Sequence, residues 1–423
     1  MFPRVIVISN NSFSKTGSNG RSLGQLVIGW PKDKLAQFCI STDTPDYDVC
    51  SNYYLVTDKS ALNGFLHFRK ARRCVINNCL NSKGNFTISH KRYNKSPVRT
   101  ICRNVIWWHE RWKSLEYKQW INDFNPQVIL LMNSDSIFMF RVAIDLSKDK
   151  RIPIVMYNTE GFYFFKKPYT YCRWWETIFF RLYQCLYRHY YSLLMNHVSY
   201  SIYANSKLQD DYYSVFRGKS MVIYTGSRLT PLNEEINTEH PVFCYIGNLE
   251  YSRIDALIEV AEVLQSIDSE FVLNVYGKYN DTIAEKAKKC KGLLLKGFID
   301  YDRVVETIYH SDVLFHAETQ NILWAEALKY GFSTKIADSI CSGKCFVMYS
   351  SPDIAGAYYL QKTGAGWHAS SKEELKTVLM TVLYNKEERN RVLLRARKIA
   401  ERYHQSNKNC AAFQQVLNDL LKV

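Results

Sequence analysis

The sequence lacks the marks of several protein classes. Its 12 cysteines form no Cys-x-x-Cys pair and no tight Cys/His cluster, which argues against a zinc site. Several lie in apolar runs such as Phe38-Cys39-Ile40, as small buried core residues do in a reducing compartment. No window of about 18 residues is both apolar and uncharged, so no transmembrane helix is expected. The chain also enters a strand pattern at once, without a signal peptide, so we expect a cytoplasmic protein.

Acidic residues are missing from one long stretch of this basic chain, whose net charge is +15. Between Phe65 and His109 there is no Asp or Glu, while the bases are Arg69, Lys70, Arg72, Arg73, Lys83, Lys91, Arg92, Lys95, Arg99 and Arg103. Such a balance indicates an anionic partner, whether nucleic acid, an anionic membrane or a phosphorylated substrate. The stretch is interpreted either as an anion-facing surface or as an ordinary solvated face.

Short apolar runs alternate with helical patterns along the chain, which is typical of parallel sheets flanked by helices. In the first half, strands are expected at 5–8, 36–40, 128–132, 152–157, 198–203 and 221–224. The second half repeats the alternation, with strands at 242–246, 271–276, 293–295, 313–316 and 345–348 and helices at 255–265, 304–309, 334–342, 373–384 and 387–420.

Two such runs in 423 residues predict two domains of the α/β class, each a Rossmann-like, doubly wound parallel sheet. The expected boundaries are 1–226 for the first domain, 227–240 for a polar linker, 241–400 for the second domain, and 401–423 for a last helix returning to the first domain.

The segment from Phe162 to Val198 combines many aromatic residues with interspersed bases. Apolar residues at helical spacing predict one long helix there. Two interpretations stay open. The helix is either part of a domain core, or an interfacial helix that touches a bilayer or a lipid-linked acceptor.

Ligands of open parallel sheets bind at the carboxyl ends of the strands, so we expect the binding and catalytic residues in the loops that follow the strands. The loop from Asn10 to Gly20 contains Gly17 and Gly20, which let a backbone approach a ligand before a helix N-terminus. It lacks the pattern Gly-x-Gly-x-x-Gly, so a dinucleotide site is not supported.

The second half carries two more specific motifs. Gly247-Asn248-Leu249 is followed by Arg253, six residues after the glycine. Gly331-Phe332-Ser333-Thr334-Lys335-Ile336-Ala337-Asp338 runs on to Gly343. Both resemble glycosyltransferase family 4, of the capsular and exopolysaccharide biosynthesis type. That family has the GT-B fold, two Rossmann-like domains facing each other across a cleft.

The resemblance implies roles for these residues in binding a nucleoside-diphosphate sugar. Arg253 stands where the family has a lysine that binds the diphosphate, whereas Asn248 replaces the family's arginine. Ser333, Thr334 and Lys335 are placed for phosphate. Asp338 takes the position of the second glutamate, which binds the ribose. Tyr330 takes that of the first, so Glu318 would serve in its place only if an insertion intervenes. An exposed helix face is the alternative for Lys335 and Asp338.

Other positions follow from the same resemblance. Phe298 and Ile299, after Gly297, match the segment that lines the nucleobase pocket. Glu160, after the fourth strand, replaces a family histidine and is a candidate for holding the transferred sugar or the acceptor. His109 and Glu110 are weaker candidates, since a lone histidine is more often structural.

The implied activity is transfer of a sugar, with retention, to a glycan or a polyprenyl-pyrophosphate-linked acceptor on the inner membrane face. Arg253 and Lys335 would stabilise the leaving diphosphate, so neither a metal nor a cofactor is expected. Two alternatives stay open: a nucleotide-sugar epimerase on the same fold, and a non-enzymatic basic protein that binds nucleic acid. We expect no nucleic acid, because the aromatic residues lie in apolar runs. Because this sequence lacks the arginine and the first glutamate of the family motifs, a family member with weakened activity or none is a further alternative.

Overall fold

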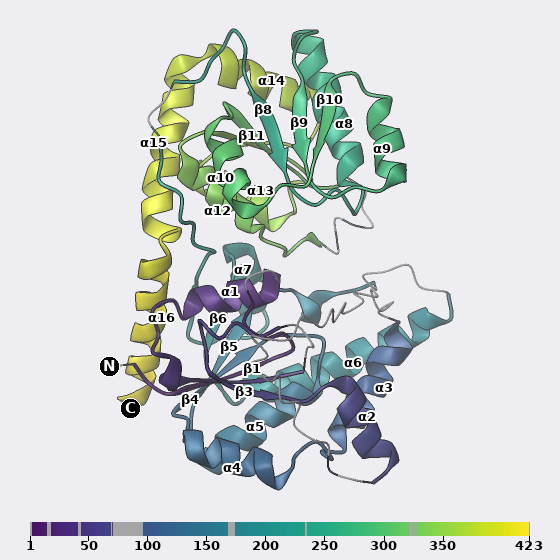
Figure 1. The fold of residues 1–423 in the computed structure, drawn as a ribbon, viewed down its shortest axis with the longest axis vertical. Coiled ribbons are helices and arrows are strands. Elements are labelled where there is room, and N and C mark those ends of the chain that lie inside the picture. The colour runs from purple at the N-terminus through teal and green to yellow at the C-terminus, as the bar shows by residue number, and fades with distance from the viewer. Residues whose placement is uncertain are drawn as a thin grey trace, which may run out of the picture. The chain divides into compact units, whose positions relative to one another are not determined.

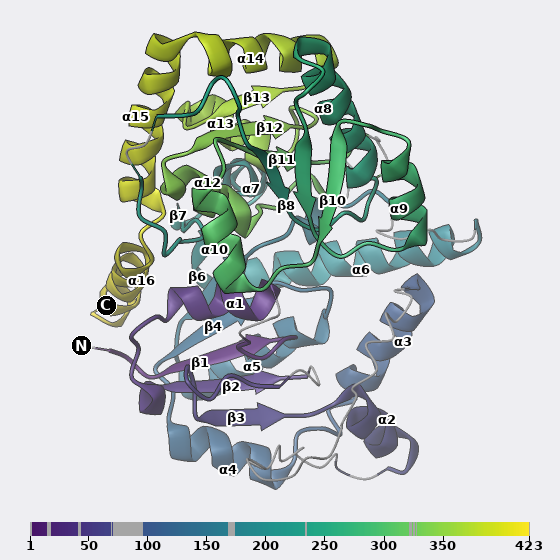
Figure 2. The same cartoon turned by 45° about the horizontal axis from the view of Figure 1, so that its top comes forward.

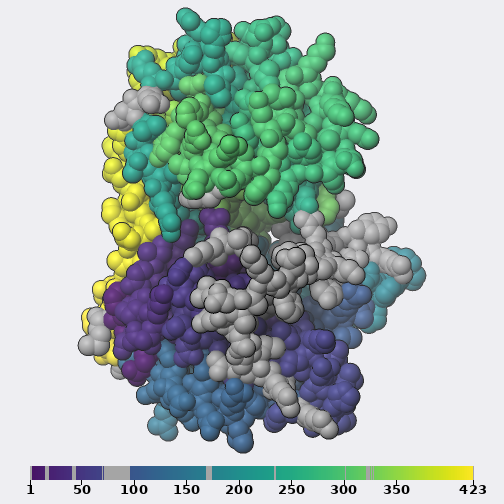
Figure 3. All heavy atoms as spheres, in the orientation of Figure 1, coloured from purple at the N-terminus to yellow at the C-terminus, as the bar shows by residue number. Residues whose placement is uncertain are grey.

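The computed structural model describes residues 2–14, 18–40, 44–68, 70, 96–167, 174–232, 235–320, 324, 326 and 328–422. The chain divides into two compact units. Unit 1 comprises Met1–Ile202, Phe216–Met221 and Cys410–Val423, and unit 2 comprises Tyr203–Val215 and Val222–Asn409. Figure 3 shows one face of the two units with all heavy atoms drawn as spheres.

Unit 1 is built on a seven-stranded sheet in the order β3-β2-β1-β4-β5-β6-β7. The pairs that join β3, β2, β1, β4 and β5 are all parallel. Every residue of β1, β2, β4 and β5 is buried, as expected for strands covered on both faces. The strands are β1 (Val5–Ser9), β2 (Leu35–Cys39), β3 (Asn52–Leu55), β4 (Val128–Met132), β5 (Ile154–Asn158), β6 (Val198–Tyr203) and β7 (Ser220–Val222).

Helices flank this sheet, and two 3-10 turns, η1 (Lys32–Lys34) and η2 (Phe162–Phe164), lie in its loops (Figure 1). The helices are α1 (Ser18–Leu26), α2 (Asp58–Leu66), α3 (Pro97–Trp108), α4 (Leu115–Phe124), α5 (Phe138–Lys150) and α6 (Glu176–Met195), with the end of α16 (Ser406–Leu421). Figure 2 shows α6 as the long helix of this unit, and it packs against α3 and α5.

Unit 2 contains a six-stranded sheet in the order β10-β9-β8-β11-β12-β13, and all of its strand pairs are parallel. The strands are β8 (Phe243–Ile246), β9 (Leu273–Tyr276), β10 (Leu293–Gly297), β11 (Val313–Ala317), β12 (Cys345–Tyr349) and β13 (Trp367–Ala369).

Alternate residues of each strand enter two different cores. From β11, Val313 and Phe315 pack with α8 (Arg253–Ile267), α9 (Asp281–Lys288) and α14 (Lys372–Tyr384). Leu314 packs on the other face with α10 (Tyr301–Tyr309), α12 (Thr334–Ser342) and α13 (Ala355–Thr363). Because α15 (Lys386–Tyr403) supplies Val392 to one core and Ala396 to the other, it closes one end of the unit.

The architecture confirms the expected class, two doubly wound α/β domains. Several details differ from the sequence predictions. The strands β3 and β13 were not predicted, because each is only three or four residues long. The helix predicted over 162–198 is shorter, since η2 and α6 are separate elements. The helix predicted over 387–420 is two helices, α15 and α16, with His404 and Gln405 between them.

The domain limits also differ from the expected ones. Helix α7 (Ser206–Tyr213), expected in the first domain, belongs to unit 2. Residues 222–232 and 401–409, expected at the end of the first domain, in the linker and in the last helix, also belong to unit 2. The two segments pair with each other: Ser227 and Gln405 form an isolated parallel β-bridge, and the Ser227 N–H donates to His404 O at 2.9 Å.

Candidate active site

The carboxyl ends of the unit 2 strands lie at one edge of the sheet, because all strands run in the same direction. Close backbone contacts join them there. The Gly247 N–H, after β8, donates to Tyr276 O at 2.8 Å, and the Gly277 N–H, after β9, donates to Gly297 O at 2.9 Å. A Cβ on Gly277 would stand 2.2 Å from Gly247 O, so this approach requires glycine.

Arg253 and Glu318 meet at this edge. Arg253 is the first residue of α8, and Glu318 directly follows β11, the neighbour of β8 in the sheet. The Arg253 guanidinium donates from Nε to Glu318 Oε2 at 2.8 Å and from Nη2 to Oε1 at 3.0 Å. The two side chains are only 13% and 8% exposed, so this is a nearly buried, two-pronged ion pair.

His316 completes the cluster. Its Nε2 lies 3.1 Å from Glu318 Oε1, and its side chain is as buried as the carboxylate. Burial by itself would raise the pKa of Glu318, but the contacts with His316 and Arg253 outweigh burial and lower that pKa to about 2. Glu318 is therefore ionised at neutral pH. Sequence reasoning missed His316, although alternation along β11 puts it on the face of Leu314.

The loop before α8 sets the position of Arg253. Asn248 Oδ1 accepts a hydrogen bond from the Glu250 N–H at 2.9 Å, which closes a turn. Tyr251 and Ser252 then take left-handed backbone conformations, with φ of 58° and 59°. Non-glycine residues rarely adopt that region, and two in succession indicate that the surrounding structure imposes this turn. Asn248, which replaces the family's arginine, here shapes the loop.

The first turn of α12 contains the predicted phosphate-binding residues. Ser333 caps the helix, because its Oγ accepts a hydrogen bond from the Lys335 N–H at 3.3 Å. Thr334 and Lys335 are the first two helical residues, half-buried at the positive end of the helix dipole. A helix N-terminus with a lysine in its first turn favours an anionic ligand.

Asp338 lies one turn further along α12 and is half-buried. Its Oδ1 accepts a hydrogen bond from Ser227 Oγ at 2.6 Å, and Ser227 is part of the paired segments near residues 225–227 and 404–406. The predicted ribose-binding carboxylate is thus held by a second segment of unit 2.

Tyr330, at the position of the family's first glutamate, is buried and has a structural role. Its hydroxyl donates to Asp211 Oδ2 at 2.7 Å, and its backbone oxygen accepts from Asn205 Nδ2 at 3.0 Å. Both partners belong to the α7 region, which this residue ties to the segment before α12. Glu318 is therefore the carboxylate that the structure puts beside Arg253.

Phe298 and Ile299 follow β10, at the other side of the same edge. Phe298 is 66% exposed, and Lys278 Nζ lies 4.7 Å above its ring. Three strand spacings separate β10 from β11, roughly 14 Å. That distance suits a nucleoside diphosphate whose base lies near β10 and whose phosphates lie near β11.

The predicted residues of unit 1 have different surroundings. Gly17 lies outside the described residues. Gly20 lies in α1, where a Cβ would stand 2.4 Å from Ser12 O, so packing within the loop explains this glycine. Glu160 follows β5 at the carboxyl edge of the sheet and is half-buried.

The two weaker candidates of unit 1 have structural partners. His109 packs against Phe65, with ring centroids 5.1 Å apart. Glu110 pairs with Lys113 at 2.7 Å and Arg141 at 3.3 Å.

The sequence contains two Asp-Tyr-Asp segments, at 46–48 and 300–302, whose paired carboxylates are of a kind that can bind a metal ion. Both have local structural roles: Asp300 Oδ1 caps α10 by accepting from the Arg303 N–H, and Asp46 Oδ1 accepts from the Asp48 N–H. Within the described residues, no group of three or more His, Cys, Asp or Glu side chains is placed to hold a metal ion. That no metal takes part stays a prediction.

Residues 230–399 match the family model for glycosyl transferases group 1. That match covers α8, α12 and the edge where Arg253 meets Glu318. No curated protein matches the sequence.

Solved structures share the fold over almost the whole chain. HepE (Alr3699) from Anabaena, in complex with UDP, is 12% identical, covers 98% of this chain and 100% of its own, and has a TM-score of 0.63. Sucrose-phosphate synthase from Thermosynechococcus elongatus is 10% identical, covers 99% of both chains, and has a TM-score of 0.64.

A third structure is a protein provisionally named UDP-N-acetylglucosamine 2-epimerase, from Listeria monocytogenes. It is 10% identical, covers 98% of this chain and 96% of its own, and has a TM-score of 0.52. At these identities the likeness concerns the fold. The chain has the GT-B fold, and its residues 230–399 are similar to the glycosyl transferases group 1 family.

Proposed function

We propose that this protein transfers a sugar, with retention, from a nucleoside-diphosphate sugar to a glycan or polyprenyl-pyrophosphate-linked acceptor in the synthesis of a cell-surface polysaccharide. The observation that carries the proposal is the edge of unit 2 that lies within the matched family segment. There Arg253 pairs with Glu318 after the neighbouring strands β8 and β11, and α12 begins between β11 and β12. The neighbour HepE is in complex with UDP, which favours a uridine nucleotide as the first donor to try.

The diphosphate is stabilised by charges of the protein. Glu318 uses two of the five N–H donors of Arg253, so three remain to bind phosphate oxygens. Lys335 and the positive end of α12 add a second positive site. Hydrogen-bond donors that are already held in place stabilise the negative charge of a leaving group without first having to reorient. This electrostatic preorganisation is usually the largest single contribution to catalysis.

The remaining site residues bind the other parts of the donor and the acceptor. Asp338 accepts hydrogen bonds from the ribose hydroxyl groups, and Phe298 and Ile299 line the nucleobase pocket. Glu160, at the edge of unit 1, holds the transferred sugar or the acceptor. No metal and no cofactor takes part.

The test is incubation with UDP-glucose and UDP-N-acetylglucosamine, with and without lipid-linked acceptor, followed by NMR of the sugar nucleotide. Release of UDP that depends on the acceptor supports the transferase. Conversion of UDP-N-acetylglucosamine to its C2 epimer without an acceptor would instead identify an epimerase. No binding and no turnover of UDP-, GDP-, CMP- or dTDP-sugars would contradict the proposal.

We further propose that unit 1 docks on the inner, anionic face of the plasma membrane through α6. None of the helices in the described residues is long and apolar enough to cross a membrane. One side of α6 enters the core through Phe180, Tyr183, Tyr187, Tyr191 and Leu194. The other side and the residues before the helix expose apolar side chains: Trp174, Trp175, Ile178, Phe179, Leu182, Leu186 and Leu193.

The charges around this apolar face favour an anionic bilayer over a neutral one. Arg181 and Arg188 are exposed on α6, and Lys166 and Lys167 are exposed before it. The single acid of the helix, Glu176, accepts a hydrogen bond from Ser96. Apolar residues flanked by bases bind the interface of membranes that contain acidic lipids.

Vesicle flotation tests this surface. We expect the protein to float with vesicles of phosphatidylcholine and phosphatidylglycerol, and less with phosphatidylcholine alone. The double variant Ile178→Ser, Leu182→Ser should lose flotation, whereas Leu394→Ser, at an equally exposed position of unit 2, should keep it. Flotation of the double variant at the level of the unchanged protein would contradict the docking surface.

A further inference from the structure

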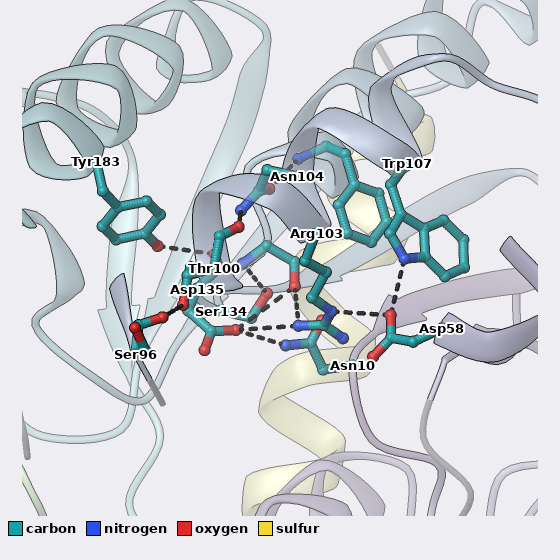
Figure 4. A network of polar contacts seen from close by, with 12 residues as sticks. Asn10, Asp58, Ser96, Thr100, Arg103, Asn104, Trp107, Ser134, Asp135 and Tyr183 are labelled. Atoms are coloured by element: carbon teal, nitrogen blue, oxygen red, sulfur yellow. Dashed lines mark hydrogen bonds and ion pairs between the residues drawn. The ribbon is translucent and has the colours of Figure 1, made fainter. Parts of the chain in front are cut away.

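The order of strands in unit 1 reverses between β1 and β4, which lie side by side although β2 and β3 come between them in the sequence. Ligands of doubly wound sheets bind at such a point, beyond the carboxyl ends of the strands. Asn10 follows β1 and Asp135 follows β4, so the two residues flank it. Figure 4 shows that polar side chains from α2 and α3 converge there as well.

Arg103, on α3, stands at the centre of this cluster. Its Nε donates to Asp58 Oδ1 at 2.9 Å, and its Nη1 donates to Ser136 Oγ at 3.1 Å. Its Nη1 also lies 3.7 Å from Asp135 Oδ1, which accepts from Asn10 Nδ2 at 3.0 Å. The side chains of Arg103 and Asp135 are about a quarter exposed, so a ligand can reach them.

Two polar atoms of the cluster have no partner among the described residues. Asn10 Oδ1 is buried and accepts no hydrogen bond. Arg103 uses Nε and Nη1 for its contacts, and its Nη2 makes none. A buried acceptor without a donor is unfavourable, and a ligand that supplies the donor removes that cost. The cluster thus lacks one donor and one acceptor, and hydroxyl groups provide both.

The charges of the cluster select among ligands. Arg103 lies between the carboxylates of Asp58 and Asp135, so the three together carry a net negative charge. That charge repels phosphate and diphosphate groups, whereas carboxylates, a guanidinium and an amide all bind neutral sugars through their hydroxyl groups. Glu160 follows β5, which is the neighbour of β4 in the sheet.

We propose that Asn10, Arg103 and Asp135 form a subsite for hydroxyl groups of a neutral sugar in the acceptor. The assignment of that sugar to the acceptor rests on the proposed transferase function. The binding of a neutral sugar at the cluster does not, because it follows from the donors, acceptors and charges of unit 1 alone.

Saturation-transfer NMR on the full chain tests the subsite. The probes are glucose, galactose and N-acetylglucosamine, with inorganic phosphate as a contrasting anion in competition. We expect at least one sugar to bind and phosphate not to displace it. Asp135→Asn and, separately, Arg103→Lys should weaken sugar binding about tenfold, equivalent to one hydrogen bond to a charged group.

Asp145→Asn is the matched control, since Asp145 forms a comparable ion pair with Lys113 on the same unit at 3.0 Å. Thermal unfolding shows which variants remain folded, and UDP binding reports separately on unit 2. A variant that unfolds is replaced by Asn10→Ala, for which the same loss is expected. Absence of sugar binding in the unchanged protein, or equal binding in the folded variants, overturns the subsite. Absence of sugar-nucleotide binding alone contradicts the transferase and leaves the test of the subsite intact.

Discussion

The Arg253 guanidinium forms two hydrogen bonds with the Glu318 carboxylate, although the two residues are 65 positions apart in the sequence. The pair joins the start of α8 to the end of β11. It therefore links the two strand ends at which the diphosphate of a donor is proposed to lie.

This ion pair should be costly to break from one side. Arg253→Met leaves Glu318 nearly buried with His316 but without the guanidinium, and Glu318→Leu leaves Arg253 nearly buried without the carboxylate. Each change lowers the free energy of unfolding by about 3–5 kcal/mol. The double variant removes both charges and should recover most of that loss. Urea unfolding of unit 2, followed by tryptophan fluorescence and circular dichroism, measures all three.

The exposed pair of Lys286 and Asp255 is the control, and its removal should change stability by less than about 1 kcal/mol. A double variant whose loss of stability equals the sum of the two single losses would show that Arg253 and Glu318 act separately.

Ser227 should affect nucleotide binding through Asp338. Without the hydrogen bond from Ser227, the Asp338 carboxylate loses a contact that orients it. We expect Ser227→Ala to weaken binding of the matching nucleotide sugar several-fold, and Asp338→Asn to weaken it about tenfold or more. Isothermal titration measures both, with Thr307→Ala on α10 as the control. Unchanged affinity in Asp338→Asn would remove this residue from the donor site.

His404 should make stability depend on pH. It is fully buried: its Nδ1 lies 2.7 Å from Thr225 O, and its Nε2 lies 2.7 Å from the Tyr359 hydroxyl. Burial lowers the pKa of His404 to about 4, below the usual 6.5. Between pH 4 and pH 6.5, His404 is protonated in the unfolded chain but stays neutral in the folded protein. The contribution of His404 to the free energy of unfolding is therefore fully present above pH 6.5 and is lost as the pH falls toward 4.

The loss expected from His404 is on the order of 3 kcal/mol. Thermal unfolding midpoints from pH 7 to pH 4 should fall more steeply for the unchanged protein than for His404→Gln. Parallel curves would mean that His404 is not the group responsible. Glu318, with its pKa of about 2, adds a loss only below its usual pKa of 4.5.

Gly20 should be required for packing. Its Cβ in Gly20→Ala would meet Ser12 O at 2.4 Å, and that backbone oxygen cannot turn aside as a flexible side chain does. We expect a loss of about 1–3 kcal/mol in the stability of unit 1. At Gly218 a Cβ meets nothing within 4 Å, so Gly218→Ala should be close to neutral. Equal stability of both variants would contradict the role of Gly20.

Much of the fold could be predicted from the sequence because buried parallel strands leave a strong signal. Runs such as Val5–Ile8 and Val128–Met132 are apolar throughout, and their alternation with helices gives the class. The short strands β3 and β13 escaped because three or four residues carry too little pattern. The end of α15 before His404 was not predicted, because the helical pattern of the sequence continues on both sides of His404. The interruption is explained by the pairing of this segment with residues 225–227, which the sequence pattern does not show.

The candidate site was predictable where a motif keeps its spacing along the chain. Ser333, Lys335 and Asp338 were found in this way, and they lie in the first two turns of α12. The partnership of Arg253, Glu318 and His316 was not predictable, because it depends on β8 and β11 lying side by side. The same holds for Asn10, Arg103 and Asp135, which three separate segments bring together.

The most direct test of the donor site is titration of UDP-, GDP-, CMP- and dTDP-sugars into the unchanged protein and into the double variant Arg253→Met, Glu318→Leu. Because the double variant removes both charges, we expect it to stay folded although it lacks the guanidinium. We predict that one nucleotide class binds the unchanged protein and that the double variant binds it at least about tenfold more weakly. Equal binding by both proteins, or no binding of any class, would contradict the donor site at Arg253 and Glu318.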